Sequence, residues 1–253
     1  LVAVMRAAVR DGLHGTEFTD RILGAQAPLF GESMEAGRLL DGGVLNRMIL
    51  YVTAVMEAKS SMGVVVAAPT AGSCGALPGA CLGAADGMDA SDAEVTRAML
   101  AAGLVGVLIQ AHSTFAAESC GCQAETGAGA GMAAAALVSL AGGTTAQAIG
   151  AASMALQNTL GLICDPVANR VEVPCLGRNV LAAGNALACA NMALAGFDPV
   201  IPLDEVIQTM DDVGRSLPAT LRCTALGGLS VTPTSRELEK RLVQLRGGSL
   251  PTG

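Results

Sequence analysis

The segment Gly129–Leu140, which reads Gly-Ala-Gly-Met-Ala-Ala-Ala-Ala-Leu-Val-Ser-Leu, decides the fold of this chain. It is rich in Ala, Leu and Met, which are strong helix formers. It also lies inside a longer stretch, Thr126–Cys164, that contains no Asp, Glu, Lys or Arg. A helix that is apolar on all sides is normally buried. The segment therefore predicts a buried helix that packs tightly against other helices.

Helical periodicity continues on both sides of this segment. We expect further helices over Leu1–Leu13, Val44–Met62, Asp92–Gln110 (with Ser91 as its N-cap), Thr145–Leu160, Val180–Leu194, Leu203–Val213 and a surface-lying Ser235–Leu245. Strand signals are confined to Val64–Val66 and Val171–Val173, and there is no βαβ alternation, long repeat or linker. The sequence therefore predicts a mainly α protein, with one helical domain over residues 1–253 and Gly/Pro-rich loops. Because the chain begins with Leu1 rather than Met, we expect its N-terminus to be truncated.

Composition narrows the class of protein. The 253 residues carry a net charge of −7, are 2% aromatic and include no Trp, which argues against nucleic-acid binding. The charge-free stretch is interrupted by Gly142–Thr145 and has no flanking aromatic belt or Lys/Arg cluster, so we expect no membrane span. No signal peptide is visible, and eight cysteines without an export signal indicate a reducing compartment. We therefore expect a cytoplasmic protein.

Four segments do not have helical periodicity. They are Ala68–Gly75, Glu118–Glu125, Cys164–Cys175 and Arg222–Leu229. Polar, Gly/Pro-rich loops between apolar helices are where binding and catalytic groups usually lie. We therefore look for the functional site in these loops.

Five of the eight cysteines divide into two groups, and Cys74, Cys120 and Cys223 lie in the loops without an assigned role. Cys81 and Cys189 lie in Ala/Leu-rich segments and are expected to be small buried core residues. Cys122, Cys164 and Cys175 lie at loops or helix ends, where their thiolates can point at a common centre. Zinc is one candidate, but the paired CxxC spacing typical of zinc sites is absent. Three thiolates also suit a [4Fe–4S] cluster with one open iron, which could act as a Lewis acid in the loss of water.

The same loops carry four motifs in a recognisable order. They are Ala68–Ser73, Gly121–Glu125, Leu162–Val167 and Val171–Cys175. Together they resemble the iron–sulfur-dependent L-serine dehydratase alpha chain, over nearly the whole chain from about Met5 to Leu242. The resemblance implies a helical catalytic domain that eliminates water from L-serine or a serine-like amino acid, giving a 2-oxo acid and ammonia. It also implies a 4Fe-4S cluster held by Cys122, Cys164 and Cys175. A beta chain or second subunit, with a Ser/His-rich loop at the active site, is expected as partner in an oligomer.

Candidate substrate-binding residues lie in two of the loops. Thr70 and Ser73 offer hydroxyls, and Gly72 offers flexible backbone, which together suit a bound carboxylate. Arg222 could hold the same carboxylate through two hydrogen bonds. The alternatives are an ordinary Gly/Ser turn and an exposed surface arginine.

Several positions depart from the family's usual pattern, among them Gly24–Gln26, which stands where the family has Gly-Gly-Glu, and Ala116 and Ala117, which stand where it has Ser and Gly. His112 stands where the family has Asn, so it is a candidate catalytic base or substrate contact, or else a structural residue. Asn169 replaces a Gly, and Asn is the next best residue at positive φ. Cys223 follows Arg222 where Glu is usual. These changes predict either altered substrate choice with retained lyase chemistry or a non-catalytic alpha-chain homolog.

The sequence is also compatible with other substrates, another cofactor and another iron ligand. The substrate could be cysteine or threonine instead of serine. A pyridoxal-phosphate lyase would need a Schiff-base lysine, and only Lys59 and Lys240 exist. Cys120, two residues before Cys122, could compete for the same iron.

Overall fold

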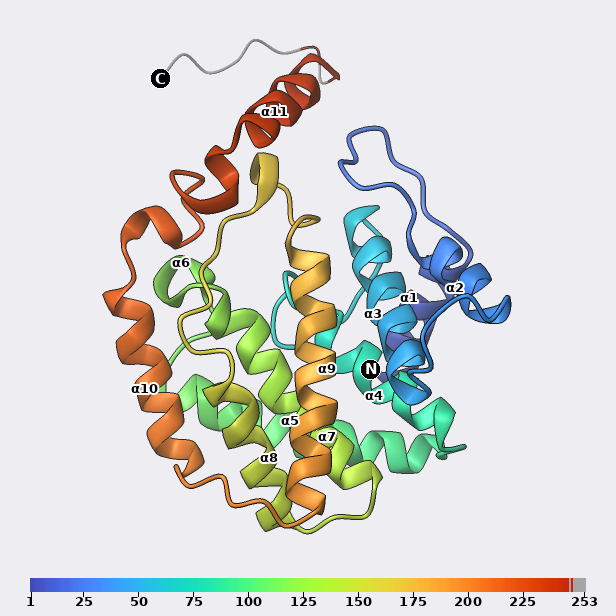
Figure 1. The fold of residues 1–253 in the computed structure, drawn as a ribbon, viewed down its shortest axis with the longest axis vertical. Coiled ribbons are helices and arrows are strands. Elements are labelled where there is room, and N and C mark those ends of the chain that lie inside the picture. The colour runs from blue at the N-terminus through green and yellow to red at the C-terminus, as the bar shows by residue number, and fades with distance from the viewer. Residues whose placement is uncertain (246, 248–253) are drawn as a thin grey trace.

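The computed structural model describes residues 1–245 and 247, and within them it is helical with no strand (Figure 1). The α-helices are α1 (Val2–Leu13), α2 (Ala27–Glu35), α3 (Val44–Ser60), α4 (Ala76–Gly87), α5 (Asp92–His112), α6 (Ala117–Cys120), α7 (Ala128–Leu140), α8 (Thr145–Gln157), α9 (Cys175–Leu194), α10 (Leu203–Ser216) and α11 (Pro233–Leu245). A π-helical turn, η1 (Gln123–Gly127), precedes α7. Three 3-10 turns follow later in the chain, η2 (Val167–Asn169), η3 (Ala219–Leu221) and η4 (Gly228–Val231). The expected mainly α class is confirmed.

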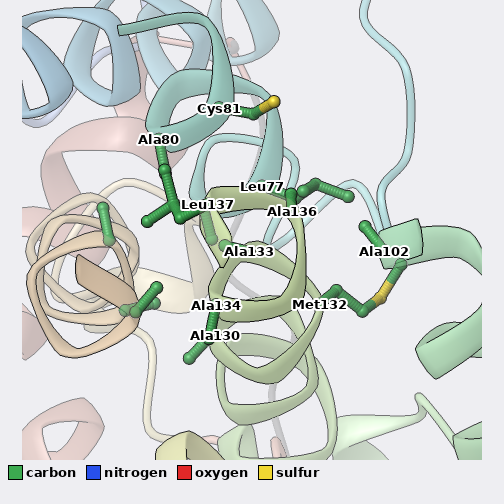
Figure 2. Close-up of a cluster of buried hydrophobic side chains, with 14 of the residues drawn as sticks. Leu77, Ala80, Cys81, Ala102, Ala130, Met132, Ala133, Ala134, Ala136 and Leu137 are labelled. Atoms are coloured by element: carbon green, nitrogen blue, oxygen red, sulfur yellow. The ribbon is translucent and has the colours of Figure 1, made fainter. Parts of the chain in front are cut away.

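Helix α7 is the core of the molecule. Every residue from Ala128 to Val138 is buried. Helices α4, α5, α8 and α9 surround it, and Figure 2 shows Leu77 and Ala80 of α4 and Ala102 of α5 among the side chains that pack around it. Alanine side chains lose no rotamer freedom on burial and let neighbouring helices approach closely. The predicted buried helix is therefore confirmed, and it positions the loops that lie at its ends.

Glycines allow equally close packing on the side of α3. A Cβ placed at Gly79 of α4 would lie 2.6 Å from Cα of Val52, and one at Gly12 of α1 would lie 2.0 Å from the carbonyl oxygen of Ala54. Real Cβ atoms do not tolerate such distances, so these two positions require glycine. Helices α1 and α4 thereby pack directly onto the backbone of α3.

Several element predictions need correction. Helices α2 and α4 were not expected, because Pro28 and the glycines of Ala76–Gly87 weaken the helical signal, although the α4 glycines serve the contact with α3. Helix α9 begins at Cys175 rather than Val180, directly after Pro174. Neither Val64–Val66 nor Val171–Val173 forms a strand in the described residues, and the carbonyl of Val173 accepts from the backbone of Val167 in a turn instead.

Helix α5 combines a well-defined start with an apolar body. Ser91 accepts a hydrogen bond from the Glu94 backbone, and Glu94 accepts one from Ser91, so the predicted N-cap is a full capping box. By length and hydropathy α5 is the one helix in the described residues that could cross a membrane, with 33% of its most apolar window buried. A single such helix is weak support for a membrane span, because core helices of soluble proteins share these properties. The absence of a membrane span stays a prediction.

Candidate active site

Cys122 is held against the segment that leads to Cys164. Gly121 has φ +71°, and a Cβ there would lie 2.7 Å from the carbonyl oxygen of Leu162, so the two backbones approach closely. The buried Gln123 donates through its side-chain amide to the carbonyl of Met210 at 2.7 Å and accepts from the backbone of Gly161 at 2.9 Å. Gln123 also donates from its own backbone to Leu162. Turns of π-helix often mark functional positions, and here one begins directly after Cys122.

Cys164 is paired with the loop that follows η3. Its backbone N–H donates to the carbonyl of Leu221 at 2.9 Å, and the backbone N–H of Cys223 donates to the carbonyl of Cys164 at 2.9 Å. These two bonds form an isolated parallel bridge between Cys164 and Arg222. The fourth predicted loop is therefore brought to the second predicted ligand.

Cys175 is fixed at the start of α9 through Asn179, one turn further along. The fully buried amide of Asn179 donates to the carbonyls of Cys175 at 2.8 Å and Gly72 at 3.0 Å. Its oxygen accepts from the backbone of Gly75 at 3.2 Å and Ala76 at 2.9 Å, where α4 begins. One side chain thus ties the Ala68–Gly75 loop to the third predicted ligand.

Two of the three predicted ligands lie directly beside each other. The ligand atoms of Cys122, Glu125 and Cys164 all lie within 4.8 Å of one another. Cys223 packs against the same buried cluster as Cys122 and Cys164. Cys175 lies outside that group, although burial and the charge of Cys122 both raise its pKa. We call Cys122, Cys164 and Cys175 the thiol group, in which Cys175 stays a predicted ligand.

The thiols differ in how readily they ionise. The two thiols lie side by side, and their interaction lowers the pKa of Cys122 and raises that of Cys164. The positive charge of Arg178 lowers the pKa of Cys122 further. Burial raises the pKa of Cys175 to about 12. Of the three thiols, Cys122 is therefore the most readily ionised.

Arg178 shows that the thiol group suits an anionic, sulfur-rich cofactor. Its guanidinium donates to the carboxylate of the buried Asp165 at 2.6 Å, and that carboxylate also accepts from the backbone of Leu229 at 2.7 Å. A second guanidinium nitrogen, Nη1, is buried without a partner among the described residues, and the guanidinium is near enough to Cys122 for its charge to lower the pKa of that thiol. A buried N–H without an acceptor is costly, and the sulfur atoms of a cluster would supply one. The residues therefore fit an iron–sulfur cluster.

The predicted substrate loop reaches the same place. Thr70 donates from its hydroxyl to Oε1 of Glu125 at 2.8 Å and accepts from the backbone of Ser73 at 3.2 Å. A Cβ at Gly72 would lie 3.0 Å from the same Glu125 oxygen, so the absence of a side chain keeps that carboxyl accessible. Burial raises the pKa of Glu125. Glu125, which motif reasoning passed over, is the contact between the loop and the thiol group.

Arg222 lies beside Cys164, whereas His112 is exposed at the end of α5. Arg222 donates to the carbonyl of Ser119 at 3.1 Å, and its Nε is buried without a described partner, beside Cys164. His112 is exposed at the C-terminal end of α5, and no described residue hydrogen-bonds with its imidazole. Its role as a catalytic residue stays a prediction.

The other residues singled out in the sequence have defined positions in the structure. Cys120 directs its sulfur to Asp211, 3.7 Å from Oδ1, so it does not join the thiol group. Cys81 and Cys189 are fully buried, as expected. Asn169 has φ +53°, which confirms that its position needs a residue that tolerates positive φ. Lys59 donates to the carbonyl of Val171.

A cavity of about 790 Å³ lies between α1 and α5, and Ala68 and Pro69 at the start of the predicted substrate loop form part of its wall. Its described lining includes Met5, Leu100 and Phe115, and none of the lining side chains is ionisable. A reaction that moves protons needs such groups. We therefore place the candidate active site at the thiol group and not in this cavity.

Fold and site together define an all-helical protein whose loops gather several thiols and a carboxyl beside a hydroxyl-bearing turn. Residues 1–230 match the family described as the serine dehydratase alpha chain. The chain is 41% identical over 249 residues to the probable L-serine dehydratase, alpha chain, of Bacillus subtilis (strain 168), covering 98% of this chain and 82% of that protein. It is 46% identical over 189 residues to the probable alpha chain of Latilactobacillus sakei (75% and 90% covered) and 36% over 241 residues to the alpha chain of Peptoniphilus asaccharolyticus (95% and 82% covered). This chain belongs to the serine dehydratase alpha chain family.

Proposed function

We propose that this chain is the catalytic alpha chain of an iron–sulfur-dependent L-serine ammonia-lyase (dehydratase). The observation that carries the proposal is the hydrogen bond from Thr70 to Glu125, which joins the hydroxyl-bearing loop to the thiol group. Family membership supports serine as the substrate, because the relatives are named L-serine dehydratases. Such an activity would serve amino-acid metabolism and supply a precursor for gluconeogenesis.

In this proposal Cys122, Cys164 and Cys175 hold a 4Fe-4S cluster. When bound, the cluster supplies a Lewis-acidic iron that assists departure of the substrate hydroxyl. Arg178 and Lys59 provide positive charge near Cys122 and Cys175, which would offset the negative charge of a cluster with three thiolates. The unpaired Nη1 of Arg178 donates to a sulfur acceptor.

The reaction removes one proton and one hydroxide from neighbouring carbons. The Cα–H bond of serine breaks, its electron pair forms the Cα=Cβ bond, and the Cβ–O bond breaks with release of water. The enamine product then hydrolyses to pyruvate and ammonia. Thr70, Gly72 and Ser73 bind the substrate carboxylate through hydroxyls and backbone. Without substrate the Thr70 hydroxyl donates its one proton to Glu125, so it turns from Glu125 to the carboxylate when substrate binds. The base is His112 or a group from a beta chain.

The proposal includes a partner and a location. The name of the relatives as alpha chains supports a beta chain that completes the enzyme, and the active form is an oligomer of the two. Eight free cysteines agree with a reducing cytoplasm.

Anaerobic reconstitution tests this function. The chain is supplied with iron and sulfide, with and without its beta chain, and release of 2-oxo acid is measured from serine, threonine and cysteine. We expect a brown, air-sensitive protein that turns over serine fastest. A protein that takes up no iron or sulfide would overturn the proposal. A Lys59 adduct after borohydride reduction would instead support the pyridoxal-phosphate alternative.

A further inference from the structure

Glu125 is a half-buried carboxyl group that forms no ion pair with the described residues. Its Oε1 accepts a hydrogen bond of 2.8 Å from the Thr70 hydroxyl, which is its one described donor. Lys59 lies near enough for its charge to act on Glu125, but its ammonium donates to the carbonyl of Val171. A carboxylate that is removed from water is costly unless a positive charge or several donors compensate it. Glu125 is therefore only partly compensated within the described chain.

The fully buried carboxyl groups of the described residues have stronger partners. Asp165, for example, accepts from the Arg178 guanidinium at 2.6 Å and from the Leu229 backbone at 2.7 Å. Each of the others has an arginine or two backbone N–H groups as donors, and these residues are Glu57, Glu172 and Asp211. Glu125 lacks both kinds of partner, which favours a positively charged ligand beside it.

Glu125 lies between the predicted substrate loop and the thiol group. Its carboxylate is within 4.8 Å of the sulfur atoms of Cys122 and Cys164, and its partner Thr70 belongs to the loop that binds the substrate carboxylate in the proposed function. In L-serine the carboxylate and the ammonium share Cα, and the hydroxyl is on the neighbouring Cβ, so the groups that bind them must lie close together. The proposed function assigns the carboxylate to the loop and the hydroxyl to the cluster. The ammonium is left without a partner.

Gly72 keeps the open side of the Glu125 carboxylate free. A Cβ at Gly72 would lie 3.0 Å from Oε1 and 3.1 Å from Oε2, so a methyl group there would cover both oxygens. Substrate binding frees the carboxylate further, because the Thr70 hydroxyl turns to the substrate carboxylate. An ammonium group, which has three N–H donors, can then bind both Glu125 oxygens.

We propose that Glu125 binds the α-ammonium of the substrate and thereby restricts the site to 2-amino acids. This inference rests on the proposed function and names the group that recognises the amino end of its substrate. Substrate binding exchanges the neutral hydrogen-bond donor of Thr70 for a charged one, and charge-assisted hydrogen bonds are the stronger kind. An acid of the same shape without the amino group cannot make this exchange.

Two ligands that differ only in the ammonium group provide the test. L-Alanine and propanoate both have the carboxylate and neither has a hydroxyl to eliminate. Their binding to the anaerobically reconstituted enzyme, with its beta chain, is therefore measured by isothermal titration calorimetry without turnover. We expect Glu125→Gln to raise the Kd of L-alanine about tenfold and to leave the Kd of propanoate within about twofold, because the variant removes only the charge. Glu125→Asp keeps the charge and should lose less affinity for L-alanine.

Glu118→Gln is the matched control. Glu118 is exposed on α6, and its charge reaches Glu125. The control variant should bind both ligands like the unmodified enzyme, which separates a direct contact from a general negative potential. Iron content and visible absorbance of each variant show whether the cluster is retained.

The outcomes separate this inference from the proposed function. If the unmodified enzyme turns over serine but binds L-alanine no more tightly than propanoate, the inference is wrong while the proposed function stands. The same holds if Glu125→Gln weakens both ligands equally or neither of them, or if it loses iron, which would make Glu125 a cluster ligand. If the unmodified enzyme takes up no iron and sulfide, the proposed function fails and the inference fails with it.

Circular dichroism shows whether Glu125→Gln folds. If it does not fold, Gly72→Ala takes its place, because the added methyl group covers the Glu125 carboxylate without removing it. This variant should weaken the binding of L-alanine more than that of propanoate. An equal effect on the two ligands would overturn the inference.

Discussion

The hydroxyl of Thr70 donates a hydrogen bond of 2.8 Å to Oε1 of Glu125, although the two residues are 55 positions apart in the sequence. Thr70 belongs to the loop before α4, and Glu125 lies in the π-helical turn that begins after Cys122. The contact therefore couples the predicted substrate loop to the predicted metal ligands. It gives the site a carboxyl group that the separate motifs did not reveal.

Removing that contact should impair activity without unfolding the protein. We expect Thr70→Val to lower kcat/KM for serine about tenfold, because a hydrogen bond to a carboxyl group of this kind contributes about 1.5 kcal/mol. Thr70→Ser keeps the hydroxyl and should stay near the unmodified value. Steady-state kinetics of the reconstituted enzyme measure both, and equal kcat/KM for the valine variant and the unmodified enzyme would show that the contact has no part in substrate binding.

The three predicted ligands should behave differently from the core cysteines. Replacing Cys122, Cys164 or Cys175 with Ser should abolish or severely reduce both cluster retention and activity. Cys81→Ala and Cys189→Ala should retain the cluster and lose only about 1 kcal/mol of stability, since each leaves a small cavity. Iron content and visible absorbance of the five variants measure the difference. A full cluster in any variant of the first three would remove that residue from the ligand set.

Asn179 should contribute strongly to stability, because its buried side chain makes four hydrogen bonds. Asn179→Ala leaves the backbone N–H groups of Gly75 and Ala76 without their acceptor. We expect a loss of about 3 kcal/mol in the free energy of unfolding, measured by urea denaturation. Asn191→Ala, at an exposed position on the same helix, should change it by no more than about 0.5 kcal/mol. A similar loss in the free energy of unfolding for the two variants would show that Asn179 does not stabilise the contact between the loop and α9.

Raising the pH should lower the stability of the folded chain through its buried core thiols. Burial raises the pKa of Cys81 to about 12, whereas the thiol of an unfolded chain ionises near pH 9. The folded protein therefore keeps a proton that the unfolded chain loses, so this stabilisation is complete below about pH 9 and declines as pH rises toward 12. Between about pH 8 and 11 the unmodified apo chain should lose about 2–3 kcal/mol more than Cys81→Ala. The free energy of unfolding of both proteins is measured by denaturation at each pH. If it falls equally in the two proteins, the pKa of Cys81 is not raised.

Periodicity and motif order were informative for different reasons. The uncharged Gly129–Leu140 segment predicted a buried helix, because nothing on any of its faces favours water. Loop composition pointed to Cys122, Cys164 and Cys175, and two of them, Cys122 and Cys164, lie within 4.8 Å of each other beside Glu125. Helix α4 escaped prediction because glycine disfavours isolated helices. Its glycines are favourable only once α3 packs against them.

By itself, the sequence determined the helical class, the buried α7 and the loops that carry the site, since these follow from local propensity and hydropathy. Only the tertiary structure decided which groups of distant loops meet. It brought Glu125 to Thr70 and Cys223 to Cys164, and it turned Cys120 toward Asp211, although Cys120 is two residues from Cys122. Contacts of this kind depend on how α7, α9 and α10 pack, and packing follows the shape of whole helix surfaces. No spacing along the chain encodes that shape.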